Sequence, residues 1–517
     1  MFSHMSRLLV CLVLGVSLCA CSMAPDYEQP KMDIPEAWTK LTPATQPLNM
    51  DWWTRFNDPV LNAMVEEALK NNQDLAAGMA GIRSAAAQAG VGSSALWPSL
   101  GAGADLTAEG ASEKMANSSF GPGSTASRWY TNYQGQLAAS WEVDFWGATR
   151  NNYTRLTNIL LQTVLNHEAL RLSIAGQVAQ SYFAMLSYDM QLETAKRTLK
   201  TREDALRIYT SRYRLGELTE LDWQRARAEV ETARATVHTT NIALDEAEAS
   251  LAVLLGKQPR EIWQNLPRGS RLDKQPTPPV LPEGLPSDLL LRRPDIRAAE
   301  FGIMAANSSI GEARARFFPS VSLTGALGTL AAAVSNLFSG PAAIWSYGAT
   351  VSLPIFSGGQ TWYNLKNAEA LKEQAEATYR QTVMEAFRDV RTSLTAQTER
   401  DRIVKATQAQ VDSLRRAANI ARIQYDNGYT DYLTVLDAER ELFAAELSLA
   451  TALQNRLSSV VSVCMALGGG WEDPGAKASF PIIDTDELVN AQRKGTVGIR
   501  AEKAAAAAAE EKAASPR

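Results

Sequence analysis

Side chains that perform acid–base or metal chemistry are scarce in this sequence. Its 517 residues include three histidines, His4, His167 and His238, which lie far apart. Histidine is the usual general base and the commonest metal ligand, so three distant histidines give little support for histidine-based catalysis. We also find no Ser/His/Asp set, phosphate-binding glycine loop or metal-ligand spacing. We therefore expect a protein that is not an enzyme and that needs no metal and no cofactor.

The cysteines indicate a covalent modification rather than a disulfide framework. An apolar run at 8–21 follows Arg7 and is too short to span a bilayer, but it suits a signal peptide at 1–20. The run ends in LCAC at 18–21, which resembles a bacterial lipobox, so Cys21 is the expected site of a covalent lipid. The alternative is an ordinary signal peptide with a chance cysteine. If Cys11 and Cys19 leave with the signal peptide and Cys21 carries lipid, Cys464 has no disulfide partner. Ser22, by resemblance to Gram-negative lipoproteins, favours sorting to the outer membrane.

The charge balance argues against nucleic acid as a partner. The formal net charge of the whole chain is −5, and it becomes −6 when 1–20 is removed, because Arg7 is the only charged residue there. Binding of nucleic acid needs a basic face. Nothing in this composition supplies one.

The elements that would position any site are organised as two repeats. Prolines are absent between Pro122 and Pro259 and between Pro354 and Pro474, so two long segments are free of helix breakers. Glycine spacing gives the register: 69 and then 40 positions separate glycines 147, 216 and 256, and the same spacings separate glycines 359, 428 and 468. The offset between the repeats is 212 here and 221 upstream, so the first repeat has nine extra residues. We place them in a loop at 110–127.

Between these glycines the pattern is helical. The segments 148–215 and 360–427 are rich in helix-forming residues and would each reach about 100 Å. The segments 217–255 and 429–467 are shorter, and helices at 58–90 and 287–315 could stack on them end to end. A seven-residue step of apolar residues predicts coiled-coil packing; the row is Leu192, Leu199, Leu206, Tyr213 in one half and Val404, Val411, Ala418, Tyr425 in the other.

Each half also contains a predicted β-hairpin. Apolar and polar residues alternate through four segments, at about 97–109, 129–145, 318–328 and 343–356, which is the pattern of strands with one apolar and one wet face. Aromatic residues near the strand ends suit an outer-membrane barrel. The alternative is a soluble sheet packed on the helices. Four strands cannot close a barrel in lipid, so a pore would require several copies of the chain.

Several motifs resemble the TolC-like outer membrane factor family, in particular its lipoprotein branch. They are APDYEQP at 24–30, WWTRFNDPVLNAMVEEALKNNQDL at 52–75, RLGELTELD at 214–222, LLLRRPDIRAAE at 289–300, IGEARARFFPSVSLTG at 310–325 and YDNGYTDYLTVLDAER at 425–440. The resemblance implies an α+β membrane protein: a homotrimer with a twelve-stranded transmembrane β-barrel, four strands per chain, continued by a long periplasmic α-helical barrel. Repeats at 51–256 and 287–470 would alternate with equatorial segments at 21–50, 257–286 and 471–517, the last ending in a low-complexity tail.

The resemblance also implies a function and a set of site residues. The protein would be a passive, lipid-anchored duct in the bacterial outer membrane, with its helices in the periplasm. Its partners would be outer-membrane lipid, a periplasmic adaptor protein and an inner-membrane pump of the resistance-nodulation-division (RND) class. The adaptor would dock on tip turns at Gly216, Leu215 and Gly428. Asp437, Tyr425 and Asp222 match family residues of the periplasmic gate, but two other gate positions are Thr430 and Thr434 here.

Three other interpretations remain open. A duct for type I protein secretion has the same architecture. A heavy-metal efflux duct is a further option, although no Met, His or Cys cluster supports it. From a different class, a coiled-coil envelope lipoprotein without a pore would explain the helices and Cys21, but not four amphipathic strands repeated in register.

Overall fold

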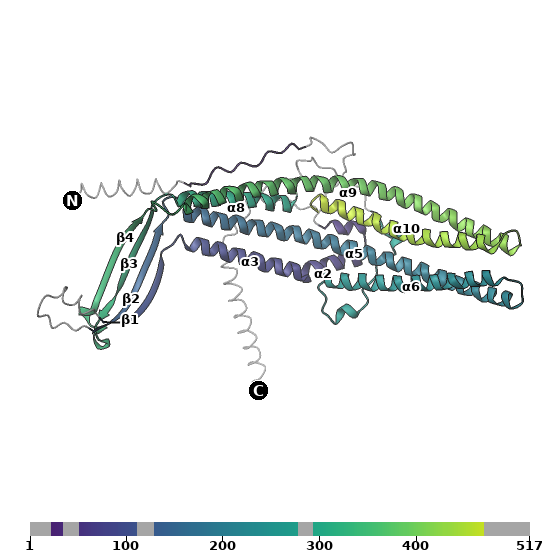
Figure 1. Ribbon diagram of the computed structural model, residues 1–517, viewed down its shortest axis with the longest axis horizontal. Coiled ribbons are helices and arrows are strands. Elements are labelled where there is room, and N and C mark those ends of the chain that lie inside the picture. The colour runs from purple at the N-terminus through teal and green to yellow at the C-terminus, as the bar shows by residue number, and fades with distance from the viewer. Residues whose placement is uncertain (1–21, 35–50, 111–128, 278–292, 470–517) are drawn as a thin grey trace, which may run out of the picture.

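The computed structural model describes residues 22–34, 51–110, 129–277 and 293–469. Within these ranges the fold is α+β and elongated: a four-stranded sheet forms one end, and long helices extend from it to the other end (Figure 1). The expected signal peptide, Cys21, most of the loop at 110–127, part of the proline-rich linker and the C-terminal segment lie outside the described residues.

The sheet is antiparallel, with the strand order β1-β2-β3-β4. Its strands are β1 (Ser99–Gly110), β2 (Trp129–Val143), β3 (Ser320–Ala331) and β4 (Ala343–Ser352). The hairpins β1–β2 and β3–β4 lie within the two halves of the chain, and pairing of β2 with β3 joins the halves. Within the described part of the chain, β1 and β4 each have one unpaired edge.

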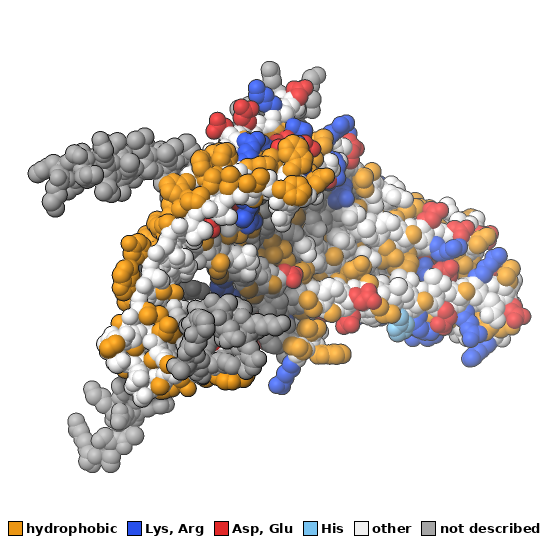
Figure 2. Space-filling model, turned by 60° about the vertical axis from the view of Figure 1, so that its left-hand side comes forward, with side chains coloured by type: hydrophobic (Ala, Val, Ile, Leu, Met, Phe, Trp, Pro, Cys, Tyr) orange, Lys and Arg blue, Asp and Glu red, His pale blue; other side chains and the backbone are white. Residues whose placement is uncertain are grey.

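The register sorts side chains onto two different faces. Leu106 pairs with Tyr133, and Leu137 pairs with Leu327, which in turn pairs with Trp345. Because side chains alternate along strands, these residues share one mostly apolar face. The opposite face carries mainly Ser, Thr, Asn, Gln and Gly, together with Asp105, Glu109 and Glu142, and the four strands contain no Lys or Arg. Figure 2 shows hydrophobic side chains along the outer edge of the curved sheet and charged ones on the helical part.

Two antiparallel helical hairpins form the body. They are α5 (Ala148–Arg214) with α6 (Glu220–Leu254), and α9 (Gln360–Asp426) with α10 (Tyr432–Ala466). The six glycines that set the repeat register, at 147, 216, 256, 359, 428 and 468, all have φ between 71° and 88°. Glycine adopts this left-handed conformation without the penalty that a Cβ brings. The glycine spacing is therefore regular because each glycine begins or ends a helix.

Shorter helices continue the line of α6 and α10 toward the sheet. They are α2 (Pro59–Asn71), α3 (Gln73–Ser94) and α8 (Pro294–Ala315). The sequence predicted one helix over 58–90, which is wrong, because the backbone leaves the helical conformation at Asn72. The Asn72 side chain caps α3 by accepting hydrogen bonds from the Asp74 and Leu75 N–H groups, at 2.9 and 3.2 Å. Of the predicted helix at 287–315, only the part from Pro294 lies within a described helix.

The main hydrophobic core lies midway along the molecule, where α2 packs against α5 and the adjoining part of α10. It includes Trp52 and Phe56 of a short 3₁₀ helix, η1 (Trp52–Phe56), and Val178, Phe183 and Val460 of the long helices. Phe56 packs on Phe183 with ring centroids 5.1 Å apart. In the described ranges, no helix has both the length and the apolar character needed to cross a membrane.

Candidate functional site

Both hairpins turn at the end of the molecule farthest from the sheet (Figure 1), and we call these two turns the tips. At the first tip, the Gly216 N–H donates to the Tyr213 carbonyl (3.0 Å) and the Glu217 N–H donates to the Arg212 carbonyl (2.9 Å). This pair of bonds is the Schellman motif, which ends a helix with a left-handed residue. Thr219 then caps α6 by accepting from the Asp222 N–H.

The second tip repeats this geometry. The Gly428 N–H donates to the Tyr425 carbonyl (3.0 Å), and the Tyr429 N–H donates to the Gln424 carbonyl (2.8 Å). Asp431 caps α10 by accepting hydrogen bonds from both the backbone N–H and the hydroxyl of Thr434. The Thr434 hydroxyl is therefore engaged in the cap.

The tips expose large apolar side chains. Leu215 is 74% exposed and Tyr429 is 84% exposed. Leu215 belongs to the predicted tip site, whereas Tyr429 was missed. A tyrosine immediately after a helix-ending glycine was the signal that could have identified it.

Two of the predicted gate residues are charged and lie near the tips. Asp437 lies in the second turn of α10, is 57% exposed, and has its carboxylate 3.8 Å from the Arg440 guanidinium. Asp222 accepts a hydrogen bond from the Thr219 hydroxyl (2.7 Å) and lies 3.6 Å from Arg225. In the described chain no hydrogen bond joins Asp222 to Tyr425, and Asp222 is paired within its own helix start. The structure therefore does not bring all three predicted gate residues together within one chain.

Tyr425 instead belongs to a tyrosine cluster that joins the two hairpins. The ring of Tyr209, on α5, lies 4.5 Å from that of Tyr432 on α10 and 6.3 Å from that of Tyr425 on α9, measured between centroids. Burial raises the pKa of Tyr209 to about 12, so its hydroxyl stays neutral. This cluster holds α5 against the α9–α10 hairpin beside the tips.

Ion pairs extend this contact toward the sheet. Glu446 of α10 lies between Arg197 of α5 and Arg415 of α9, at 2.7 and 2.8 Å. The Arg202 guanidinium, buried between the hairpins, pairs with Glu229 at 2.9 Å. The Arg197–Glu446 pair joins the two hairpins, whereas the Arg202–Glu229 pair lies within the first hairpin.

The helix ends meet at two joints midway along the molecule. At the first joint, the Asn72 side-chain amide donates to the carbonyl of Leu254, the last residue of α6, at 2.9 Å. A Cβ at Gly256 would lie 2.2 Å from the Asn71 carbonyl oxygen, so α6 and α2 meet without room for a side chain there. Asn72 thus binds the end of α6 while it caps the start of α3.

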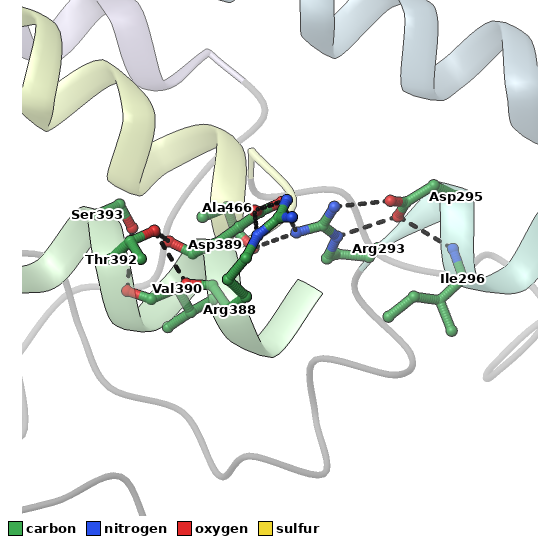
Figure 3. A network of polar contacts seen from close by, with 9 residues as sticks. All are labelled: Arg293, Asp295, Ile296, Arg388, Asp389, Val390, Thr392, Ser393 and Ala466. Atoms are coloured by element: carbon green, nitrogen blue, oxygen red, sulfur yellow. Dashed lines mark hydrogen bonds and ion pairs between the residues drawn. The ribbon is translucent and has the colours of Figure 1, made fainter. Parts of the chain in front are cut away.

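Arg293 occupies the corresponding place in the second repeat (Figure 3). Its guanidinium donates to the carbonyl of Ala466, the last residue of α10, at 3.3 Å, and to both carboxylate oxygens of Asp295 at the start of α8. It also lies 3.6 Å from Asp389 on α9. Burial works against the charged form, but Asp295 and Asp389 together keep the pKa of Arg293 above its ordinary value. Asn72 and Arg293 differ by the upstream offset of 221, and Leu254 and Ala466 by the downstream offset of 212.

Asp58 connects the helices to the segment that follows α6. Its fully buried carboxylate accepts hydrogen bonds from the Tyr182 hydroxyl (2.7 Å), the Gln275 amide (2.6 Å) and the N–H groups of Val60 and Leu61. Burial alone would raise the pKa of Asp58, but these hydrogen bonds hold it below its ordinary value. This cluster was not predicted, because its members are distant in sequence.

In the part of the chain that the structure describes, no group of three or more His, Cys, Asp or Glu side chains is placed to hold a metal ion.

Comparison with known proteins identifies the family. The sequence profile of the outer membrane efflux protein family matches residues 64–257 and 285–469. These two matches coincide with the two repeats.

Several relatives align over most of their length. The outer membrane protein OprJ of Pseudomonas aeruginosa is 35% identical over 479 residues, which is 90% of this chain and 96% of that protein. The toluene efflux pump outer membrane protein TtgF of Pseudomonas putida is 34% identical over 476 residues, covering 89% and 96%. The cation efflux system protein CusC of Escherichia coli K12 is 32% identical over 462 residues, covering 88% and 98%.

The three-dimensional comparison agrees. The fold is similar to that of the Campylobacter jejuni CmeC outer membrane channel, with a TM-score of 0.82 and 25% identity over 91% of this chain and 98% of that one. The chain therefore belongs to the outer membrane efflux protein family.

Proposed function

We propose that the chain is the outer-membrane exit duct of a tripartite efflux system, which passively conducts drugs or other small toxic compounds out of the cell. As a member of a channel family, it is not an enzyme. The observation that carries the proposal is the two-faced sheet, with an apolar face for lipid and a polar face for a watery lumen. The sheet continues into two helical hairpins about 100 Å long.

The duct is completed by three copies of the chain. Four strands cannot close a transmembrane barrel, and open sheet edges are not tolerated in lipid. In a homotrimer the free edge of β4 in one copy pairs with the free edge of β1 in the next, giving twelve strands. The hairpins then surround the same axis as a periplasmic tube, with 21–50, 257–286 and 471–517 as its equatorial collar.

Lipid on Cys21 anchors the N-terminus beside this barrel. Support comes from Ser22, the first described residue, whose hydroxyl donates to the side-chain oxygen of Asn151 at 3.0 Å. Asn151 lies in the first turns of α5, just after β2 ends at Val143. Ser22 therefore lies at the level where the strands become helices, which is where the barrel would leave the membrane.

The tips are the sites for the partners. A periplasmic adaptor docks there, through Gly216, Leu215 and Gly428 of the predicted site and the exposed ring of Tyr429, and connects the duct to an RND pump. Asp437, Tyr425 and Asp222 form the gate in this arrangement. The relatives TtgF, a toluene efflux pump outer membrane protein, and CusC, a cation efflux system protein, support an efflux role over type I secretion.

Asp437→Ala tests the gate. Three copies of Asp437 around the axis would give a negative constriction that favours cations. The variant is expected to have a higher single-channel conductance and a weaker cation preference in planar bilayers. Asp412→Ala is the control, because Asp412 is a similarly exposed carboxylate far from the tip that pairs with its helix neighbour Arg415. Unchanged selectivity of Asp437→Ala would contradict the gate assignment.

The proposed function itself is tested with protein extracted from outer membranes. We expect a heat-modifiable trimer that conducts ions, and we expect its gene to restore drug tolerance to a strain lacking its own duct. An oligomer without conductance would favour the pore-free scaffold. Restored protein secretion without drug tolerance would favour the type I interpretation.

A further inference from the structure

The N-terminal segment 22–34 lies along α8 in a defined register. The Pro25 carbonyl accepts a hydrogen bond from the Asn307 amide (2.6 Å), and the Tyr27 hydroxyl donates to Glu300 (3.0 Å). Farther along, the Gln29 amide donates to the Tyr379 hydroxyl of α9 (3.0 Å). The segment is therefore bound to the body of the molecule at several points, and its start lies against α5 and the end of α8.

At that start, Asn151 has an unused hydrogen-bond donor. Its side chain is buried, with 5% of the residue exposed, and its Oδ1 accepts from the Ser22 hydroxyl. The Ser22 oxygen in turn accepts from the Ala24 N–H at 3.3 Å. The Nδ2 group of Asn151 is buried and has no partner in the described structure. A buried donor without an acceptor is costly, so a missing acceptor is expected at this place.

Gly311 keeps this place open. A Cβ at Gly311 would lie 2.7 Å from Asn151 Nδ2 and 2.8 Å from the Ala24 nitrogen. Any other residue would therefore push the N-terminal segment away from α5 and α8. Gly311 is helical, so close approach rather than turn geometry requires glycine here.

The chemistry of the residue before Ser22 identifies the acceptor. Signal cleavage would leave Cys21 with a free α-amine, and a charged amine can only donate hydrogen bonds. Once acylated, the same nitrogen becomes part of an amide whose carbonyl oxygen accepts them. We propose that Asn151 and Gly311 form a seat for the acylated N-terminus, in which Asn151 Nδ2 donates to an acyl carbonyl on Cys21. This inference rests on the proposed lipid anchor.

The seat fixes the lipid to the body of the protein instead of leaving it on a loose tether. The acyl chains then begin at the first turns of α5, beside the membrane surface. Lipidation also becomes linked to docking of segment 22–34, because the modified cysteine supplies the missing acceptor.

The test compares Asn151→Asp in two backgrounds: the lipidated trimer and a Cys21→Ser form exported with an ordinary signal peptide. Aspartate still accepts from Ser22 but repels a carbonyl. The readout is the rate at which trypsin cleaves after the exposed Lys31 in the native trimer, which requires the segment to undock. In the lipidated protein, Asn151→Asp is expected to speed cleavage about five-fold, the effect of losing one ordinary hydrogen bond. In the unlipidated protein the free α-amine can donate to the new carboxylate, so no acceleration is expected.

Asn307→Asp is the matched control, since it removes the bond to Pro25 without touching the seat, and it should speed cleavage equally in both backgrounds. Gly311→Ala would crowd Ala24 as well as Asn151, so it should speed cleavage in both backgrounds and mark the rate of an undocked segment. An equal effect of Asn151→Asp in both backgrounds, or none, would overturn the seat alone. The mass of the released peptide 21–31 separates the two hypotheses, because a peptide without acyl chains overturns the lipid anchor and the seat together.

Discussion

Asp58→Ala is expected to cause the largest loss of stability among single substitutions in the helical body. The change leaves the buried Tyr182 hydroxyl without its acceptor, and it uncaps the Val60 and Leu61 N–H groups at the start of α2. Each buried group left unpaired costs about 1–3 kcal/mol, so the total is about 3 kcal/mol or more. Urea unfolding followed by tryptophan fluorescence measures it, because Trp52 lies in the same core.

Two comparisons identify the cause. Asp58→Asn keeps the shape and one acceptor oxygen but loses the charge, so it should lie between the wild type and Asp58→Ala. Asp412→Ala removes an exposed carboxylate, and such surface pairs contribute about 0–1 kcal/mol. If Asp58→Ala unfolds at the same urea concentration as Asp412→Ala, the buried network does not hold the linker to the helices.

The contribution of Asp58 to the free energy of unfolding is also expected to depend on pH. Its hydrogen bonds hold the folded-state pKa of Asp58 below that of an unfolded aspartate, which titrates at about 3.9. The stabilisation by the charged carboxylate is therefore fully present above about pH 4 and is lost as the pH falls through the lower, folded-state pKa. The stability difference between wild type and Asp58→Asn should shrink over that range and stay constant at neutral pH.

Gly428→Pro is expected to have the largest effect on function. Proline fixes φ near −65° and has no N–H, whereas Gly428 has φ of 75° and donates to the Tyr425 carbonyl. The second tip would lose both its conformation and a Schellman bond, so we expect efflux to be abolished while trimers still assemble. Gly216→Pro should do the same at the first tip. Normal drug tolerance in complemented cells would refute the assignment of the tips as docking sites.

Alanine provides the matched control. A Cβ at Gly428 would meet nothing within 4 Å, so Gly428→Ala pays only the backbone penalty, about 1–2 kcal/mol, and should retain most efflux. Gly256 has nearly the same φ, but its Cβ would lie 2.2 Å from the Asn71 carbonyl. Gly256→Ala should therefore destabilise the protein more than Gly428→Ala, although each glycine follows the end of a helix.

Local patterns made much of this fold predictable. The alternation of apolar and polar residues along strands and the glycines at helix ends are local features of the sequence. The four strands, the two hairpins and both tips could therefore be predicted. The joint at Asn72 could not, because its amide binds Leu254, 182 residues away. The Asp58 cluster was missed for the same reason, since Gln275 lies 217 residues from its partner. An asparagine inside a predicted helix was the one local sign of a break.

The equal glycine spacings constrain how the length of this protein can change. One inserted helical residue lengthens a helix by about 1.5 Å and rotates everything beyond it by about 100°. An insertion in α5 alone would therefore place the first tip farther from the sheet than the second tip. It would also misalign the packing contact between α5 and α6. Viable insertions or deletions must occur in matched sets across α5, α6, α9 and α10. Natural or engineered variants of this duct should differ in tube length by whole, paired blocks of residues, and not by single indels.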